Sequence, residues 1–318
     1  MDVVALYGNL LGLIVAPVGV GVVMGLAGVK RTFASVLFAY AFYLFQTVVV
    51  IMAVWEANLF NNSWILPFIV LVGWIMSAGV ALGFGRRFGY TDKEKGSFLF
   101  CICISNHGYT LLGIVAFVVF GAQGLAQATY AQFFIIPFLV IFCFPAARYF
   151  SEQTEAETTK TSIRRHVFDR RNLPLVAMLI GLGLNLGGMP RPVLCDPILK
   201  YAVYAGTLVS GVAIGLLVDL RKVFSFVREN VFSFVYRSSV YPLFFLGCAW
   251  ILGLNPLDTS ILVLFGIVPS AVFSNMIADM FDLDRDLTSS VYLVSTALFI
   301  VISLPVYLFL VECLTDLV

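Results

Sequence analysis

The chain has 318 residues, of which 61% are hydrophobic and 12% are charged, whereas a soluble domain is roughly half apolar and about a quarter charged. This composition excludes an ordinary soluble protein and indicates one that is embedded in lipid. The net charge of +1 gives no indication of a nucleic-acid partner, and the six cysteines follow neither a zinc-site nor a disulfide spacing.

Charge-free windows predict five membrane-spanning segments in the first half of the chain. A spanning helix needs about 20 mostly apolar residues, and its backbone polar groups must be satisfied within the segment, which favours helices over strands. A fourth window is too long for one span and predicts two, divided at the turn-like residues 121–124. The windows are residues 3–29, 33–55, 64–85 and 96–147.

The second half repeats this arrangement after a polar stretch at residues 149–171. Its five windows are residues 172–190, 201–218, 238–257, 259–278 and 287–311. We therefore predict an all-α polytopic membrane protein with ten transmembrane helices. A first five-helix repeat (1–148) and a linker (149–171) precede a second repeat (172–318), which is inverted because each half has an odd number of spans.

The Lys and Arg residues predict the orientation. All of the 19 basic residues except Arg191 and Lys200 fall at loops on one side of this topology, with Arg237 assigned to such a loop. The positive-inside rule places these loops, including the linker, in the cytoplasm and both termini outside, in a plasma (inner) membrane. The first apolar run has no basic residues before it, so we expect a retained span and not a signal peptide.

Two spans contain residues that disfavour a continuous helix. Asn106, His107 and Gly108 lie near the middle of the fourth span, and Pro269 and Ser270 lie in the ninth. Such residues are poor material for the interior of a helix, and breaks at membrane depth are tolerated where the backbone lines a cavity. Matching Phe120 with Phe281 places Gly108 opposite Pro269, so we predict two broken, crossing helices at equivalent depth.

A broken helix presents a free N-terminus, which attracts anions. We therefore predict a substrate-binding site formed by two groups of residues, which are Asn106, His107 and Gly108 in span four and Pro269, Ser270 and Asn275 in span nine. The alternatives are that the breaks only kink their helices and that the two asparagines hold helices together.

His107 and Asp279 are the candidates for ion coupling. An ionisable residue within the membrane is a functional hypothesis by default, and His107 could bind substrate or carry a proton. Its alternative is a neutral histidine bonded to a neighbouring carbonyl. Asp279, like Asp219, lies near a cytoplasmic helix end, where a solvated carboxylate is ordinary. A proton, Na⁺ or the membrane potential could drive transport, and the lack of mid-span carboxylates disfavours sodium.

The sequence lacks the motifs of nucleotide binding and of metal-dependent catalysis. The sequence contains no phosphate-binding Gly-rich loop with the Walker pattern and no His-Glu-x-x-His. With two histidines, a multi-histidine metal site is not expected. We predict no cofactor, no resident metal and no enzymatic activity.

Several motifs resemble the auxin efflux carrier family of membrane transport proteins, part of the bile acid–sodium symporter-like superfamily. They are Asn106-His107-Gly108, the turn from Phe120 to Leu125, the Asn172-Leu173-Pro174 start of span six, and Pro269 with the following residues. The chain departs from the family at Gly113-Ile114-Val115, where a proline is common. The resemblance implies crossing broken helices, scaffold and transport subdomains interleaved between the repeats, an organic anion substrate, and elevator-like alternating access.

We therefore expect a secondary active transporter of small organic anions such as weak carboxylic acids, in contact with membrane lipid. A homodimer is compatible with a bundle that has a scaffold domain. The alternatives are a sodium-coupled symporter of the bile-acid type, a ligand sensor that does not transport, and a membrane-embedded enzyme.

Overall fold

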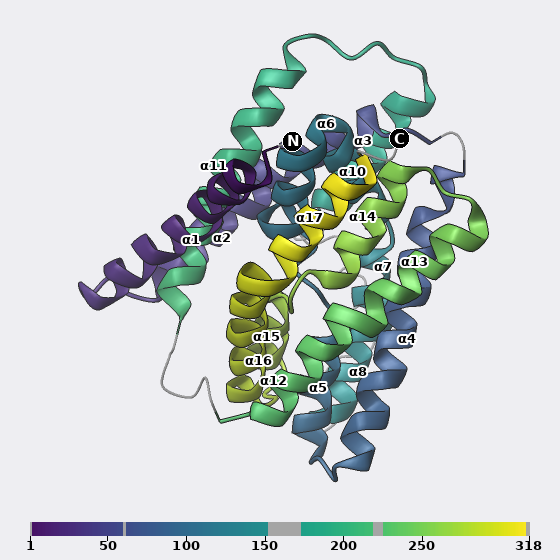
Figure 1. The fold of residues 1–318 in the computed structure, drawn as a ribbon. Coiled ribbons are helices and arrows are strands. Elements are labelled where there is room, and N and C mark those ends of the chain that lie inside the picture. Colours follow the sequence, from purple (N-terminus) through teal and green to yellow (C-terminus); the bar gives the residue numbers. More distant parts are fainter. Residues whose placement is uncertain (1, 60–61, 152–172, 219–224, 316–318) are drawn as a thin grey trace.

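The computed structural model describes residues 2–59, 62–151, 173–218 and 225–315. These residues form helices throughout, with a single isolated bridge between extended segments (Figure 1). Most of the predicted linker, residues 149–171, and Asp219 lie outside the described residues.

The helices of the first half, in chain order, are α1 (Val3–Leu26), α2 (Thr32–Tyr40), α3 (Thr47–Glu56), α4 (Leu66–Arg87), α5 (Asp92–Cys103), α6 (Ile114–Ala131), α7 (Ile135–Phe138) and α8 (Phe144–Phe150). Those of the second half are α10 (Leu173–Leu186), α11 (Cys195–Leu217), α12 (Val227–Val235), α13 (Tyr241–Leu252), α14 (Pro256–Ile267), α15 (Val272–Met280), α16 (Arg285–Leu298) and α17 (Leu304–Thr315). Wider π-helical turns join α2 to α3, α7 to α8, α12 to α13 and α16 to α17, and another precedes α6.

Seven helices within the described residues are long and apolar enough to cross a membrane, and two shorter apolar helices, α10 and α14, accompany them. The all-helical, membrane-spanning class predicted from composition is therefore confirmed. The count of ten spans and the inverted repeat stay predictions.

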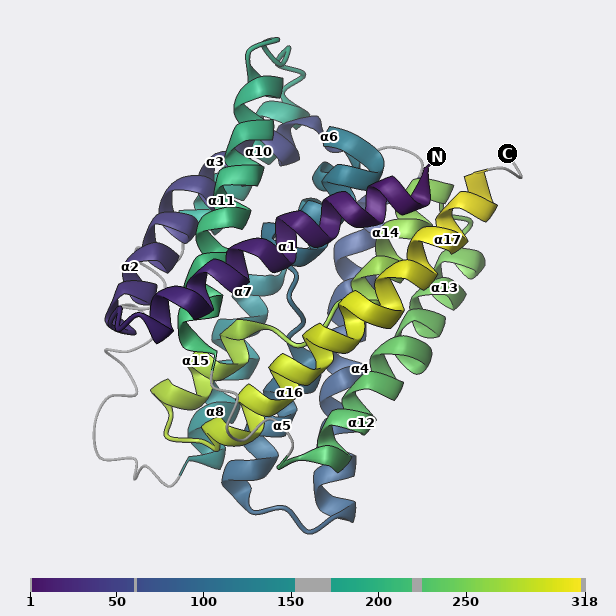
Figure 2. The ribbon, with the colours of Figure 1, turned by 60° about the vertical axis from the view of Figure 1, so that its left-hand side comes forward.

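The helices pack as two groups. In the first group, α1 and α2 pack on α11, and α3 packs on α10. In the second, α4 packs on α5, α13 on α14, and α16 on both α5 and α12. Figure 2 shows α2, α3, α10 and α11 on the left of the molecule and α4, α12 and α13 on the right, while α1 runs from the left of the view to the N-terminus on the right. Helix α6 contacts members of both groups.

The contact between α1 and α11 depends on glycine. A Cβ atom on Gly21 would lie 2.2 Å from the carbonyl oxygen of Val212, and one on Gly215 would lie 2.1 Å from that of Val18. Both neighbours are backbone atoms, so a larger residue would force the helices apart. Small residues at such contacts let two membrane helices approach closely.

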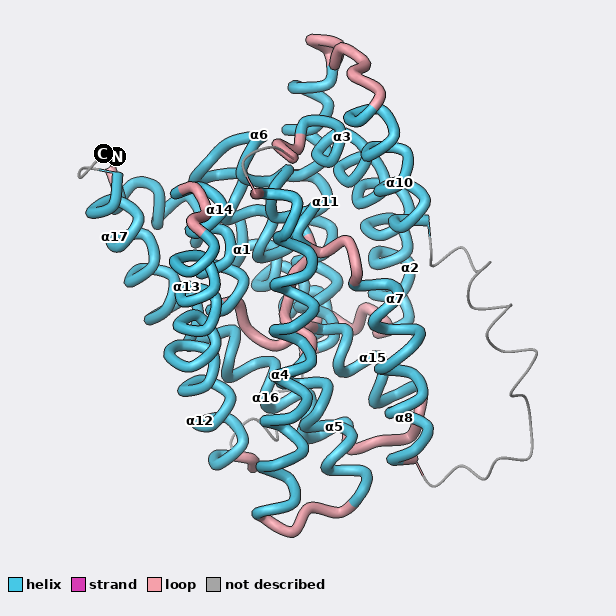
Figure 3. Tube along the Cα trace, turned by 90° about the vertical axis from the view of Figure 1, so that its right-hand side faces the viewer, coloured by secondary structure: helices cyan, strands magenta, loops and turns pink. Residues whose placement is uncertain are grey.

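Non-helical backbone interrupts the second group at mid-height, as the pink segments inside the bundle in Figure 3 show. Residues 104–108 separate α5 from the π-helical turn at Tyr109–Gly113, and residues 268–271 separate α14 from α15. When the two predicted repeats are aligned at the last residues of α5 and α14, Cys103 is matched with Ile267. This alignment differs by three residues from the one that matches Gly108 with Pro269. Gly121, at a φ of 67° that favours glycine, bends the chain inside α6.

Arg237 does not lie in a loop as predicted. It belongs to the π-helical turn Tyr236–Val240 between α12 and α13, inside an apolar helix of 26 residues, and its side chain is 2% exposed. The prediction was wrong because the span was taken as the charge-free window 238–257, which begins directly after this arginine. Its charge is instead held by groups from distant parts of the chain.

Candidate functional site

The two non-helical segments of the second group cross and bind each other through their backbones; we call this the crossover, residues 104–108 and 268–271. Ser105 and Ser270 form an antiparallel bridge. The amide of Asn106 donates to the carbonyl of Pro269 at 2.8 Å, and the amide of Ala271 donates to that of Ile104 at 3.0 Å. These bonds satisfy backbone groups that would otherwise be unpaired at this depth.

Four helical ends meet at the crossover. Helices α5 and α14 end there, while the π-helical turn at Tyr109 and α15 begin there. Neither start has a side-chain cap, since its N-cap residue is Gly108 or Ala271, and neither has an acidic residue in its first turn. Uncapped first-turn N–H groups carry partial positive charge, so both starts favour an anion.

Asn106 has one free donor at the crossover. Its side-chain oxygen accepts a hydrogen bond from Thr110 at 2.5 Å, while its buried amide nitrogen has no partner within the described part of the chain. The residue is 7% exposed. An unsatisfied buried donor is costly, which makes this amide a good candidate for binding a ligand oxygen.

His107 lies against aromatic side chains of the second group. Its ring stacks on Phe265 of α14 with centroids 3.9 Å apart, and Trp74 of α4 lies 5.7 Å away. The residue is 4% exposed, and neither ring nitrogen has a partner among the described residues. A neutral imidazole must carry one N–H, so this ring, like Asn106, has an unused donor.

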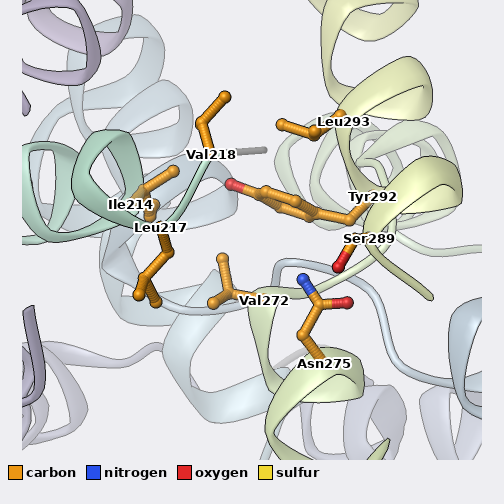
Figure 4. Close-up of a pocket in the computed structure, with 8 residues that line it drawn as sticks. All are labelled: Ile214, Leu217, Val218, Val272, Asn275, Ser289, Tyr292 and Leu293. Atoms are coloured by element: carbon orange, nitrogen blue, oxygen red, sulfur yellow. The ribbon is translucent and has the colours of Figure 1, made fainter. Parts of the chain in front are cut away.

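Asn275 occupies a different place from His107. It lines a small cavity of about 30 Å³ between α11, α15 and α16 (Figure 4). In Figure 4 its amide points toward Ser289 and Tyr292 of α16, opposite the apolar side chains of α11. Its side-chain oxygen is buried without a partner among the described residues. The cavity has room for about two water molecules and is bordered by both helix groups.

The remaining predicted residues contribute mainly backbone. Gly108 occupies the N-cap position before Tyr109 without capping it, and Pro269 supplies a carbonyl to the crossover. Ser270 is fully buried, and its hydroxyl lies 3.4 Å from that of Ser274. The structure thus brings Asn106, Gly108, Pro269 and Ser270 together. Asn275 lines a separate cavity, and His107 is not among the residues that line it.

Asp279 lies away from the crossover. It forms an ion pair with Arg285 at 3.2 Å, in which both side chains are about half exposed. An exposed pair of this kind contributes little to stability, and its geometry resembles that of an ordinary solvated carboxylate.

Sequence reasoning did not anticipate the burial of Arg237 and Asp258. Arg237 donates to the Ser105 hydroxyl and the Val268 carbonyl at the crossover and to two carbonyls in the last turn of α5. Asp258, which lies between the predicted spans 238–257 and 259–278, is fully buried and accepts hydrogen bonds from Ser63, Gln127 and Asn255. Each lies next to the end of a charge-free window, and that position was the only available signal.

Comparison with known proteins agrees with this architecture. Residues 29–308 match the family described as "Membrane transport protein". An "Uncharacterized transporter" from Methanothermobacter thermautotrophicus is 27% identical over 243 residues, which cover 76% of this chain and 77% of the relative. A multi-pass helical protein with this match is a membrane transporter. The chain belongs to the membrane transport protein family, the auxin efflux carrier family that its motifs resemble.

Proposed function

We propose that the protein is a secondary active transporter of small organic anions such as weak carboxylic acids, with its substrate site at the crossover. The observation that carries the proposal is the pair of uncapped helix starts at Tyr109 and Val272, which meet at backbone segments bonded to each other. Secondary transporters commonly bind anionic groups at such half-helix N-termini near the midplane.

The unused donors support an oxygen-rich ligand. The Asn106 amide and the His107 ring each hold a buried donor without a partner among the described residues. A carboxylate accepts several hydrogen bonds at once. Asn275 would contact substrate from the cavity between the groups, with Ser270 and the backbone of Gly108 and Pro269 completing the site.

The two helix groups favour elevator-like alternating access. The first group would act as the scaffold, and the second, which contains the crossover, would move against it as the transport subdomain. The cavity at Asn275 holds about 30 Å³, less than a carboxylic acid needs, so substrate entry requires the groups to separate. The proposal places both termini outside the plasma (inner) membrane and the linker in the cytoplasm, with a homodimer as the assembly.

Uptake into proteoliposomes tests the site. Asn106→Ala removes a donor to the substrate, and Pro269→Ala removes the residue that prevents a continuous helix at the crossover, so both are expected to reduce uptake of a transported carboxylate at least about tenfold. Asn9→Ala is the control, because Asn9 is an exposed asparagine on α1. Unchanged uptake in both crossover variants would exclude the proposed site.

The alternatives have distinct outcomes. A sensor would bind a carboxylate without accumulating it under any gradient. A symporter of the bile-acid type would require sodium for uptake, and a proton-coupled carrier using His107 or Asp279 would lose its pH dependence in His107→Gln or Asp279→Asn. Transport is proposed in preference to catalysis, with no cofactor.

A further inference from the structure

Arg237 binds the C-terminal ends of two helices at once. Its guanidinium donates to the carbonyls of Cys101 at 2.9 Å and Ile102 at 3.0 Å, in the last turn of α5. It also donates to the carbonyl of Val268, the residue after α14, at 3.1 Å. A hydrogen bond to the Ser105 hydroxyl completes the set. Four acceptors from two crossing segments therefore converge on one side chain.

The charges at this point nearly balance. The C-terminus of a helix carries about −0.5 of an elementary charge, so the ends of α5 and α14 together contribute about −1 against the +1 of Arg237. Among the described residues, no carboxylate forms an ion pair with Arg237. The guanidinium thus neutralises the helix ends and leaves the positive starts at Tyr109 and Val272 unopposed.

The same position has another occupant in many secondary transporters. Carbonyls at half-helix C-terminal ends and in unwound segments there hold the coupling sodium ion or proton. Here a side chain supplies the positive charge, and an arginine keeps that charge at every physiological pH. A resident guanidinium leaves these carbonyls no role in binding a transported cation.

We propose that Arg237 is a positioning residue that serves as a built-in cation of the crossover, in the place where other carriers bind a coupling sodium ion. The role deepens the proposed function, because a permanent cation keeps the site positive for an anionic substrate. It acts through the crossover backbone and does not require contact with the substrate.

Thermal unfolding of the purified full-length protein tests this role without any substrate. Melting temperatures are compared in sodium chloride and in choline chloride at equal ionic strength, with and without ethylguanidinium. The wild type is expected to give the same melting temperature in both salts. Arg237→Ala should lower the melting temperature by about 5 °C or more and should recover part of the loss in sodium or ethylguanidinium, but not in choline.

Two further variants separate charge from packing. Arg237→Met fills the space with an uncharged chain, so it should be destabilised without responding to either cation. Arg237→Lys keeps the charge and should melt above Arg237→Gln, which keeps polarity alone. Arg86→Ala is the control, because Arg86 is an exposed arginine in the last turn of α4, and this variant should show no response to cations.

The proposal is overturned if the wild type is itself stabilised by sodium over choline. It is also overturned if sodium and ethylguanidinium raise the melting temperature of Arg237→Ala no more than that of Arg237→Met. If Arg237→Ala does not fold, the proposal is overturned when Arg237→Gln is as stable as Arg237→Lys. In proteoliposomes, Arg237→Ala should make anion uptake depend on sodium. If the wild type transports no anion, the proposed function fails while the unfolding results still decide the role of Arg237.

Discussion

The two ends of α14 carry opposite buried charges that are held in different ways. At the N-terminal end, the Asp258 carboxylate accepts from the Gln127 amide at 2.8 Å, from the Asn255 amide at 2.7 Å and from the Ser63 hydroxyl. At the C-terminal end, Arg237 donates mainly to backbone carbonyls. Both charges complement the helix dipole.

The difference lies in what each charge requires of its surroundings. Asp258 depends on three particular side chains, so single substitutions can leave donors unpaired. Arg237 depends on the path of the backbone, which substitutions alter less directly. We infer that the N-terminal end of α14 is a fixed anchor to the chain near Ser63 and to α6, whereas the C-terminal end belongs to the site.

The largest effect is expected from Asp258→Ala. It removes the acceptor that Ser63 and Asn255 share, takes away one of the two acceptors of the Gln127 amide and leaves the buried Ser63 hydroxyl without this partner, at a cost of about 3 kcal/mol or more. Equilibrium unfolding in mixed micelles measures it. Asp92→Ala, in the first turn of α5 with a side chain 68% exposed, should cost at most about 0.5 kcal/mol. Similar losses in the two variants would contradict the anchor.

Gln127→Leu is expected to have an intermediate effect. The Gln127 amide donates both to Asp258 and to the carbonyl of Asn58 at 3.0 Å, so its loss should cost about 1–2 kcal/mol by the same unfolding measurement. Gln132→Leu is the control, because its amide donates to Ala128 within its own helix and should cost less. A larger loss of stability in Gln132→Leu than in Gln127→Leu would show that Gln127 is not part of the anchor.

The smallest effect is expected from Ser105→Ala. Arg237 loses one neutral acceptor and keeps three carbonyls, so the cost should be about 0.5–1 kcal/mol, and the melting temperature should remain independent of sodium. A loss as large as that of Asp258→Ala would mean that Arg237 also depends on particular side chains, and the contrast between the two ends would not hold.

Local sequence was sufficient for features that depend on neighbours along the chain. Long apolar windows predicted membrane helices, and Gly121, with its positive φ, lies in the stretch interpreted as a turn. Asn106, His107, Gly108 and Pro269 weaken helical hydrogen bonding by their own chemistry, and they lie in the non-helical segments 104–108 and 268–271.

The sequence by itself determined the class of protein, because a long apolar window requires lipid wherever it lies in the fold, and its motifs identified the family. Only the tertiary structure decided where the charges lie. Arg237 binds groups more than a hundred residues away in the chain, and Asp258 is as distant from Ser63 and Gln127. A charge adjoining an apolar window is consistent with a solvated loop or with a buried site, and only packing against distant segments supplies the partners that make burial favourable.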